Sequence, residues 1–231
     1  MHGPDLADLG GIRLDGVGVE SDGHRIIRDV SVELGGRRIA VIGANGSGKS
    51  TFARLLNGLV APSAGEIRVL GESPSRARSR IGFVFSSPDA QLLMPTVRED
   101  VALTLRGRGI GRAEVHDRVE RALRRHGLEQ LADVPVHSLS GGQKQLLAFA
   151  SVLVGEPALV VADEPTTLLD RRNARRIGDL LIEELTMPAV IVTHDLELAA
   201  RCDTAALFDE GRVRATGPAD EVVDVYARSC A

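Results

Sequence analysis

The 231-residue sequence contains no tryptophan, one tyrosine and only two cysteines, Cys202 and Cys230. Aromatic residues make up 3% of the chain, so Leu, Val, Ile and Ala must form the core. The aromatic platforms that stack on single-stranded nucleic acid are therefore not expected. Two cysteines form no disulfide framework and match no zinc-ligand spacing, which is typical of a protein from a reducing compartment.

Long apolar stretches and a strong charge of one sign are also missing. The apolar runs are short, as in Ala158–Ala162, and none approaches the roughly 20 residues that cross a bilayer. Residues 1–20 lack a cationic start followed by an apolar run, so we expect no secretory signal. The net charge of −4 argues against binding nucleic acid through bulk charge. If the protein works at a membrane, another chain supplies the membrane span.

Short apolar and β-branched runs predict a parallel β-sheet. The clearest runs are Ile39–Ile42, Ile81–Phe85, Ala158–Ala162 and Ala189–Thr193. Most of them are apolar at nearly every position, which is typical of strands covered by helices on both faces. Amphipathic stretches predict helices at residues 49–59, 113–126, 143–154 and 171–185. The expected fold class is therefore α/β.

Other parts of the chain follow different patterns. Residues 12–19 and 26–34 alternate between apolar and polar and predict antiparallel strands, and residues 205–215 predict a hairpin that turns at Gly211. Residues 88–155 contain helical patterns and no convincing strand. We therefore expect one domain, 1–231, with a core of residues 1–87 and 156–231 and an inserted helical subdomain at 88–155.

A glycine-rich loop follows the strand Ile39–Ile42 and precedes a helix. Its sequence fits G-x-x-x-x-G-K-[ST], in which backbone N–H groups and a lysine contact phosphates and a hydroxyl reaches Mg²⁺. The expected nucleotide-binding residues are Gly43, Ala44, Asn45, Gly46, Ser47, Gly48, Lys49, Ser50 and Thr51. The alternative is a glycine-rich turn that binds nothing.

Two acidic residues, Asp163 and Glu164, follow the buried strand Ala158–Ala162. Asp163 is expected to hold Mg²⁺ together with Ser50, and Glu164 is expected to polarise the water that attacks the γ-phosphate. A plain acidic pair at the end of a strand is the alternative interpretation. The upstream loop favours the catalytic one.

Between these motifs lies Leu139–Gln143, a Ser-Gly-Gly stretch that opens a helix. Alone it would indicate only a helix cap. The order of glycine loop, LSGGQ and Asp-Glu nevertheless resembles the ATP-binding-cassette (ABC) ATPases over residues 10–220. Asp170 matches the D-loop position of that family, and His194 matches its switch histidine.

The resemblance implies a RecA-like parallel-sheet core that binds ATP and Mg²⁺ and works as a pair of cassettes, with either an identical or a paralogous partner chain. In the family, each ATP lies between the glycine loop of one chain and the signature of the other. The residues implied to contact the ATP held by the partner are Ser140, Gly141, Gly142 and Gln143. Asp170 would position the contact between the chains, and His194 would bind the γ-phosphate and hold the attacking water.

The sequence departs from the family pattern at two places. Ser86 stands where the family usually has a glutamine that approaches Mg²⁺, so Ser86 is a further candidate near the metal. Glu20 and Ser21 stand near the position of the usual aromatic that stacks on adenine. His24 or Arg25 is the remaining candidate to cover the base.

Residues 87–101 resemble the ATPases of energy-coupling-factor (ECF) importers, which take up vitamins or metal ions. In those systems this segment grips a transmembrane coupling protein, and a further membrane subunit binds the solute. The implied contacts are Gln91, Leu92, Leu93 and Met94, with Val97 in the same patch. The alternative is that these side chains pack the core of the subdomain. Ser86 with Pro-Asp-Ala-Gln most resembles the biotin importers, although cobalt, nickel and other vitamins remain open.

The expected function is thus ATP hydrolysis that powers uptake, at the cytoplasmic face of the cell membrane and without nucleic acid. One alternative is a single-cassette scaffold of the kind used in iron–sulfur assembly. Another is a nucleotide-binding regulator without turnover, against which Glu164 and His194 argue.

Overall fold

The computed structural model describes residues 3–21 and 23–229, and Cys230 lies outside this range. In the described residues a three-stranded sheet has the order β2-β1-β4, and a six-stranded sheet has the order β5-β6-β7-β3-β8-β9. The strands of the first sheet are β1 (Ile12–Ser21), β2 (His24–Leu34) and β4 (Ala64–Val69). Those of the second are β3 (Arg38–Ile42), β5 (Ile81–Val84), β6 (Leu159–Asp163), β7 (Ala189–Val192), β8 (Thr204–Asp209) and β9 (Arg212–Pro218).

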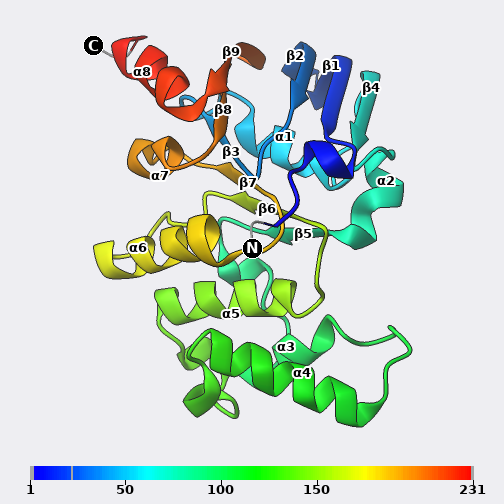
Figure 1. Cartoon of the computed structure of the whole chain (residues 1–231), viewed down its shortest axis with the longest axis vertical. Coiled ribbons are helices and arrows are strands. Elements are labelled where there is room, and N and C mark those ends of the chain that lie inside the picture. The colour runs from blue at the N-terminus through cyan, green and yellow to red at the C-terminus, as the bar shows by residue number, and fades with distance from the viewer. Residues whose placement is uncertain (1–2, 22, 230–231) are drawn as a thin grey trace.

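Helices connect the strands and cover the larger sheet (Figure 1). The α-helices are α1 (Lys49–Leu56), α2 (Pro74–Ala77), α3 (Val97–Leu103), α4 (Arg112–Arg125), α5 (Gly141–Leu153), α6 (Arg171–Asp179), α7 (Leu196–Ala200) and α8 (Ala219–Ser229). Short 3-10 helices lie at Ala7–Leu9, Arg78–Arg80, Pro88–Ala90, Glu129–Leu131 and Val136–Ser138. No helix of the described residues is long and apolar enough to cross a membrane.

The predicted parallel sheet is confirmed. β3 pairs in parallel with β7 and β8, and β6 pairs in parallel with β5 and β7. All five residues of β3 and of β6 are buried, because each strand is covered on both faces. Among the described strands of this six-stranded sheet, only β9 runs antiparallel, as the second strand of the hairpin expected around Gly211.

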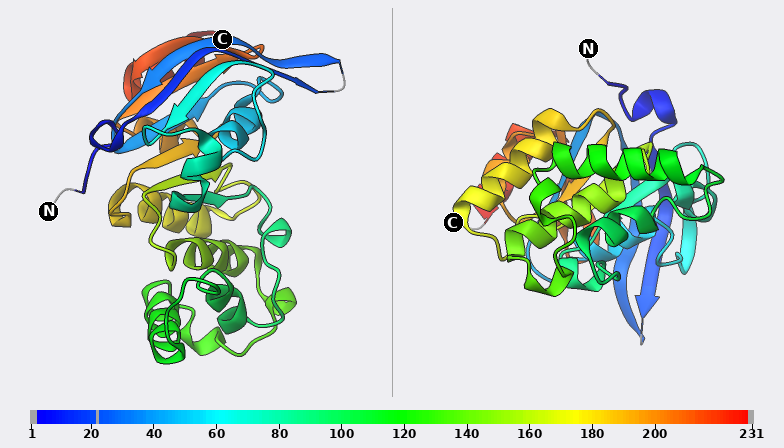
Figure 2. Two further views of the ribbon diagram at one scale, coloured as in Figure 1. Left: turned by 90° about the vertical axis from the view of Figure 1, so that its right-hand side faces the viewer. Right: turned by 90° about the horizontal axis from the view of Figure 1, so that it is seen from below.

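Buried apolar side chains form two clusters, one on each face of the six-stranded sheet. One joins the three-stranded sheet and α1 to one face of the six-stranded sheet, through residues such as Val41 and Phe52. The other joins the opposite face to the helices, through residues such as Ile42, Leu147 and Phe149. Residues 88–155 hold α3, α4 and α5 and no strand in the described chain, and they lie at the end of the molecule remote from the antiparallel sheet (Figure 2).

The helix expected over residues 171–185 is present, but its pitch changes in the last part. α6 ends at Asp179, and a π-helix follows at Leu180–Glu184, closed by a hydrogen bond from Leu185 N to Leu180 O. Over a single turn, the same apolar pattern fits an α-helix and a π-helix. The sequence therefore could not distinguish the two.

Candidate functional site

The glycine loop between β3 and α1 is shaped by close packing on its outer side. Gly43 has φ 139°, and a Cβ at this position would lie 2.0 Å from the carbonyl oxygen of Phe208 in β8. Gly48 has φ 103°, and its Cβ would lie 3.1 Å from the carbonyl oxygen of Ile26 in β2. Only glycine fits these two positions. The turn of the β8–β9 hairpin also holds the loop, since Gly211 N donates to Ser47 O at 3.0 Å.

The opposite side of the loop is open. Ala44, Asn45 and Gly46 are exposed, and a Cβ on Gly46 would meet no atom within 4 Å. Ser47 is buried, and its Oγ has no hydrogen-bond partner in the described residues. A phosphate group can therefore approach the backbone of this loop at the N-terminus of α1, as the sequence motif requires.

Lys49 lies over the loop and is only 5% exposed. Its Nζ donates to the carbonyl oxygens of Gly43 at 2.7 Å and Ala44 at 2.9 Å. Burial lowers the pKa of the ammonium, and the negative charges of Glu164 and Asp163 partly offset this effect. No carboxylate of the described residues forms an ion pair with the ammonium, so its charge is available to an anion in the loop.

Ser50 and Asp163 form the adjoining part of the site. Ser50 Oγ donates to Asp163 Oδ1 at 2.9 Å, and Asp163 is 1% exposed at the end of β6. Burial raises the pKa of this carboxyl, while the hydrogen bond from Ser50 and the charge of Arg54 act in the opposite direction.

The oxygens of Ser50 and Asp163 are hard ligands of the kind that Mg²⁺ prefers. The described chain contains no group of three or more His, Cys, Asp or Glu side chains that could hold a metal by itself. The residues present therefore fit an ion that takes its other ligands from water and phosphate oxygens.

The two candidate catalytic side chains, Glu164 and His194, lie together. His194 Nδ1 is 2.7 Å from Glu164 Oε2, and Thr167 Oγ1 donates to the same oxygen at 3.1 Å. Glu164 follows β6 and His194 follows β7, and because these parallel strands are neighbours their ends bring the pair together. Glu164 also has φ 50°, a left-handed conformation that is costly for a residue other than glycine.

The signature residues form the start of α5. Ser140 and Gln143 make a capping box, in which Gln143 N donates to Ser140 Oγ at 3.3 Å and Ser140 N donates to Gln143 Oε1 at 2.8 Å. The helix cap that the sequence indicated is thus present. The N-terminus of α5 nevertheless stays exposed. A Cβ on Gly141 would meet no atom within 4 Å.

Gly142 packs against the start of α6. A Cβ there would lie 2.4 Å from Cγ of Asn173. Asn173 Nδ2 donates to Asp170 Oδ2 at 3.0 Å, and Asp170 caps α6 by accepting from Asn173 N at 2.8 Å. The structure therefore groups the signature with Asp170, whereas Lys49, Ser50, Asp163, Glu164 and His194 form a second group.

No hydrogen bond of the described residues joins the signature, Ser140–Gln143, to the loop, Gly43–Ser50. Thr51 lies half-buried in α1 behind the loop. His24 and Arg25, the candidates to cover the base, are exposed at the start of β2. One chain thus presents two separate sets of candidate anion-binding groups.

The segment after β5 agrees with the sequence only in part. Ser86 is exposed. Gln91, expected to contact a partner, accepts from Phe85 N at 3.1 Å and donates to Ala148 O at 3.3 Å, so its amide ties the residue after β5 to α5. Leu92 packs against the core, Met94 is half-buried, and Leu93 is 72% exposed.

Val97 is fully buried, so its expected place in the exposed patch is wrong. It lies at the start of α3, where the helix turns it into the core. Asp100, which the sequence interpretation left without a role, fixes this segment. Its Oδ1 accepts from the backbone N–H groups of Leu93 and Met94, and its Oδ2 accepts from Ser151 Oγ at 2.8 Å.

Comparison with known proteins agrees with this geometry. The ABC transporter family profile matches residues 27–167. The biotin transport ATP-binding protein BioM of Rhizobium etli is 41% identical over 218 residues, which cover 93% of this chain and 97% of BioM. The structure of cbiO1 from Clostridium perfringens, described as part of the ABC transporter complex cbiONQ, superposes with a TM-score of 0.82 at 35% identity, covering 95% of this chain and 93% of cbiO1.

A second structure, the ATP-binding cassette MJ0796 as a dimer with ADP and Pi, has a TM-score of 0.78 at 28% identity and covers 90% of this chain and 98% of that chain. The shared α/β cassette fold confirms the fold class expected from the sequence. The ABC ATPases are a family of enzymes that hydrolyse ATP. The chain belongs to this family and is an ATP-binding subunit of an ABC transporter.

Proposed function

We propose that this chain hydrolyses ATP at a seam between two cassettes and thereby powers uptake through an ECF-type importer, with biotin as the favoured solute. The observation that carries the mechanism is the separation of the two anion-binding groups within one chain. Lys49 and Glu164 belong to one group and Ser140 to the other. A pair of chains placed head to tail would complete both sites, as the two-fold symmetry of a dimer allows.

Each side chain has a defined task in this mechanism. Lys49 binds the β- and γ-phosphates, while Ser50 and Asp163 hold Mg²⁺, which supplies positive charge against the phosphates. Glu164 accepts a proton from the attacking water. His194 and Thr167 hold Glu164 through Oε2, so the carboxylate is oriented before ATP arrives.

The second group acts on the ATP of the partner. Ser140, Gly141 and the start of α5 offer a hydroxyl and backbone N–H groups to the phosphate, and Asp170 holds the adjoining contact. The negative triphosphate would thus join two protein surfaces, and loss of the γ-phosphate would weaken the contact.

The names of the relatives support the transport assignment. BioM is a biotin transport protein and cbiO1 is part of a transporter complex, and both match nearly the whole chain. The exposed Leu93 beside Met94 offers an apolar contact to a transmembrane coupling protein, with a separate membrane subunit that binds the solute. We therefore expect the chain to work at the cytoplasmic face of the membrane, held there by its partners.

Replacing Glu164 by Gln tests the catalytic assignment. The variant should bind ATP as tightly as the original chain, because the amide keeps the size of the side chain, whereas hydrolysis should fall about 10²- to 10⁴-fold without the base. ATP should then hold the chains as a dimer, which size-exclusion chromatography measures. Undiminished phosphate release would refute the role of Glu164. Glu33→Gln, an exposed change on β2, is the matched control.

Purification from the native membrane tests the transport assignment. The chain should co-purify with a multi-span membrane protein and a small solute-binding membrane subunit. Recovery of a soluble partner alone would favour an assembly scaffold instead.

A further inference from the structure

Three asparagines occur in the sequence, and two of them, Asn45 and Asn57, precede a glycine. Asparagine before glycine is prone to deamidation, because a residue without a Cβ leaves its backbone nitrogen open to the amide carbon of the preceding side chain. The third asparagine, Asn173, precedes an alanine. The structure gives the three side chains different surroundings, so their stability toward this reaction should differ.

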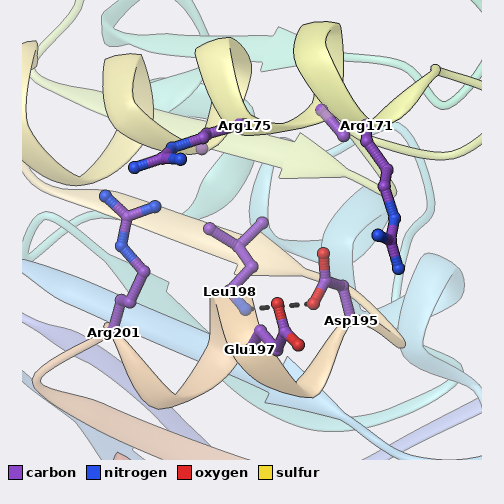
Figure 3. A pocket seen from close by; sticks show the side chains of 8 residues that line it. Arg171, Arg175, Asp195, Glu197, Leu198 and Arg201 are labelled. Carbon is purple, nitrogen blue, oxygen red and sulfur yellow. Dashed lines mark hydrogen bonds between the residues drawn. The ribbon is translucent and has the colours of Figure 1, made fainter.

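Asn173 is held by hydrogen bonds in the first turn of α6. This helix borders a charged cavity of about 560 Å³, which Arg171 and Arg175 line (Figure 3). Asn173 Nδ2 donates to Asp170 Oδ2 at 3.0 Å, and the N–H of the next residue, Ala174, donates to Asp170 O at 2.8 Å. Both the amide and the nitrogen that would attack it are therefore occupied.

Asn57 is protected by burial at the end of α1. It is 6% exposed, and Gly58 N donates to Leu55 O at 3.0 Å. Attack by this nitrogen would require the hydrogen bond to break and the end of the helix to open. Asn57 and Gly58 form the same dipeptide as Asn45 and Gly46, and we expect them to react slowly.

Asn45 lies at the tip of the glycine loop and lacks both kinds of protection. It is exposed, and neither its side chain nor the N–H of Gly46 forms a hydrogen bond with any described residue. A Cβ on Gly46 would meet no atom within 4 Å, so the tip has room for a ring. The turn is closed by a hydrogen bond from Ser47 N to Ala44 O, whose 3.2 Å length lies at the long end of the normal range.

We propose that Asn45 is a modification site, at which the nucleotide-free chain deamidates spontaneously. Gly46 N attacks Asn45 Cγ and closes a succinimide ring. The bond between Cγ and Nδ2 breaks, and ammonia leaves with the proton of Gly46 N. Water then opens the ring at either carbonyl carbon, which yields aspartate or isoaspartate at this position. The reaction consumes only water and involves no oxidation or reduction.

The modified loop should bind ATP poorly. Either product adds a negative charge beside the phosphates, and isoaspartate also lengthens the main chain by a methylene group where backbone N–H groups must converge. ATP should in turn protect Asn45, because phosphate oxygens accept from the N–H groups of the loop and occupy them. This protection rests on the proposed ATP site. A chain kept without nucleotide would thus lose its capacity for ATP as it ages.

Peptide mass spectrometry measures the reaction at both Asn-Gly sites of the purified chain. After incubation at pH 8 in heavy-oxygen water, trypsin in ordinary water releases Asn45 within residues 39–49 and Asn57 within residues 55–68. Acid formed during the digestion lacks the heavy label. Asn45 should convert at least about tenfold faster than Asn57 in the folded chain, and the two rates should converge in urea. Equal rates in the folded chain, an unmodified Asn45, or the same difference in urea would overturn the proposal.

Protection by ATP is measured in the Glu164→Gln chain, which should keep the nucleotide unhydrolysed. ATP with Mg²⁺ at ten times its Kd should slow the conversion of Asn45 about tenfold and leave that of Asn57 unchanged. An unchanged rate at Asn45, with ATP bound, would overturn the contact between nucleotide and loop tip. A freshly purified chain that binds no ATP in calorimetry would instead count against the proposed function.

The Asn45→Ser chain provides the control for the loss of binding, because serine has no amide and forms no succinimide. During incubation without nucleotide, the original chain should lose ATP-binding sites in proportion to the conversion of Asn45. The Asn45→Ser chain should keep the number of sites that it had at the start. Calorimetry at intervals measures both. Equal losses in the two chains would exclude deamidation of Asn45 as the cause.

Discussion

Glu164 combines a strained backbone with a side chain held from two sides. Its φ of 50° costs a residue other than glycine on the order of 1–3 kcal/mol. The hydrogen bonds from His194 and Thr167 end on a single oxygen, Oε2, of its carboxylate. The strain therefore lies at the residue that the proposed mechanism needs in a fixed orientation.

Lys49→Ala should weaken ATP binding about 10- to 100-fold, because hydrogen bonds to a charged group contribute about 1.5–3 kcal/mol each. Isothermal titration of the purified chain with ATP measures the change. Lys144 is the only other lysine in the sequence, and its Nζ pairs with Asp89 Oδ1 at 2.7 Å. Lys144→Ala should bind ATP like the original chain, and equal affinities for both variants would contradict the role of Lys49.

His126 gives the stability of the chain a defined pH dependence. The side chain is 3% exposed, its Nδ1 has no hydrogen-bond partner among the described residues, and burial lowers its pKa to about 4, assisted by the charges of Arg125 and Arg176. Below pH 6.5 the unfolded chain takes up a proton that the folded chain does not accept until about pH 4. Folding should therefore lose up to about 3 kcal/mol as the pH falls through this window.

Urea unfolding of the original chain and of His126→Phe at pH 7 and pH 4.5 measures this effect. The loss of stability between the two pH values should be smaller in the variant, because phenylalanine takes up no proton. If both proteins lost the same stability between pH 7 and pH 4.5, His126 would not be the cause of the pH dependence.

Residues of the site differ in how far the sequence could predict them. Lys49 and Asp163 could be predicted, because each belongs to a short sequence motif in which neighbouring residue types indicate its role. Gln91 and Asp100 depend on partners far along the chain, Ala148 and Ser151, and no local pattern reveals those contacts. Asp100 carried no usable sequence signal, because its role depends on its burial and on the donors Leu93 N, Met94 N and Ser151 Oγ.

At the scale of elements, the contact between α5 and α6 joins the signature to Asp170. Gly142→Ala would push the new Cβ into Asn173, and the amide would lose its hydrogen bond to Asp170. We expect a loss of about 1–3 kcal/mol in the free energy of unfolding. Urea unfolding should show partial recovery when Asn173→Ala is added.

Gly141→Ala is the matched control for this contact. Its Cβ would meet no atom within 4 Å, so the variant should unfold at the same or a slightly higher urea concentration. If the two glycine variants were equally destabilised, packing against Asn173 would not be the cause.

The elements that the sequence predicted best are those buried on both faces. β3 and β6 are apolar at almost every position, so their pattern is unambiguous. β4 was missed because only Ile67 and Val69 of its six residues are buried, and Gly65 interrupts the pattern. α7 was missed because five residues are too few for a helical period to be visible.

At the scale of the whole molecule, Leu93 is the exposed apolar residue that the proposed function assigns to a membrane partner. Leu93→Asp should leave the Tm of the isolated chain nearly unchanged, because the side chain is 72% exposed. Recovery of the membrane subunits should fall at least about tenfold, since burial of a leucine contributes about 1.5–3 kcal/mol. Quantitative pull-down from native membranes measures the recovery.

Val225→Asp provides the control for this experiment, because Val225 is an exposed apolar residue of α8, 43% exposed. It should leave recovery of the membrane subunits unchanged. If both changes reduced the recovery of the membrane subunits equally, the partner would not bind specifically to the segment around Leu93.

The close packing of Gly43 on Phe208, with Gly211 hydrogen-bonded to Ser47, has a consequence for biosynthesis. The outer support of the glycine loop comes from a hairpin near the end of the chain, although the loop itself is made early. A nascent chain on the ribosome therefore lacks this support until the hairpin has emerged. We therefore expect competence to bind nucleotide to arise late in translation, and a product that stops before Phe208 to lack a properly supported loop.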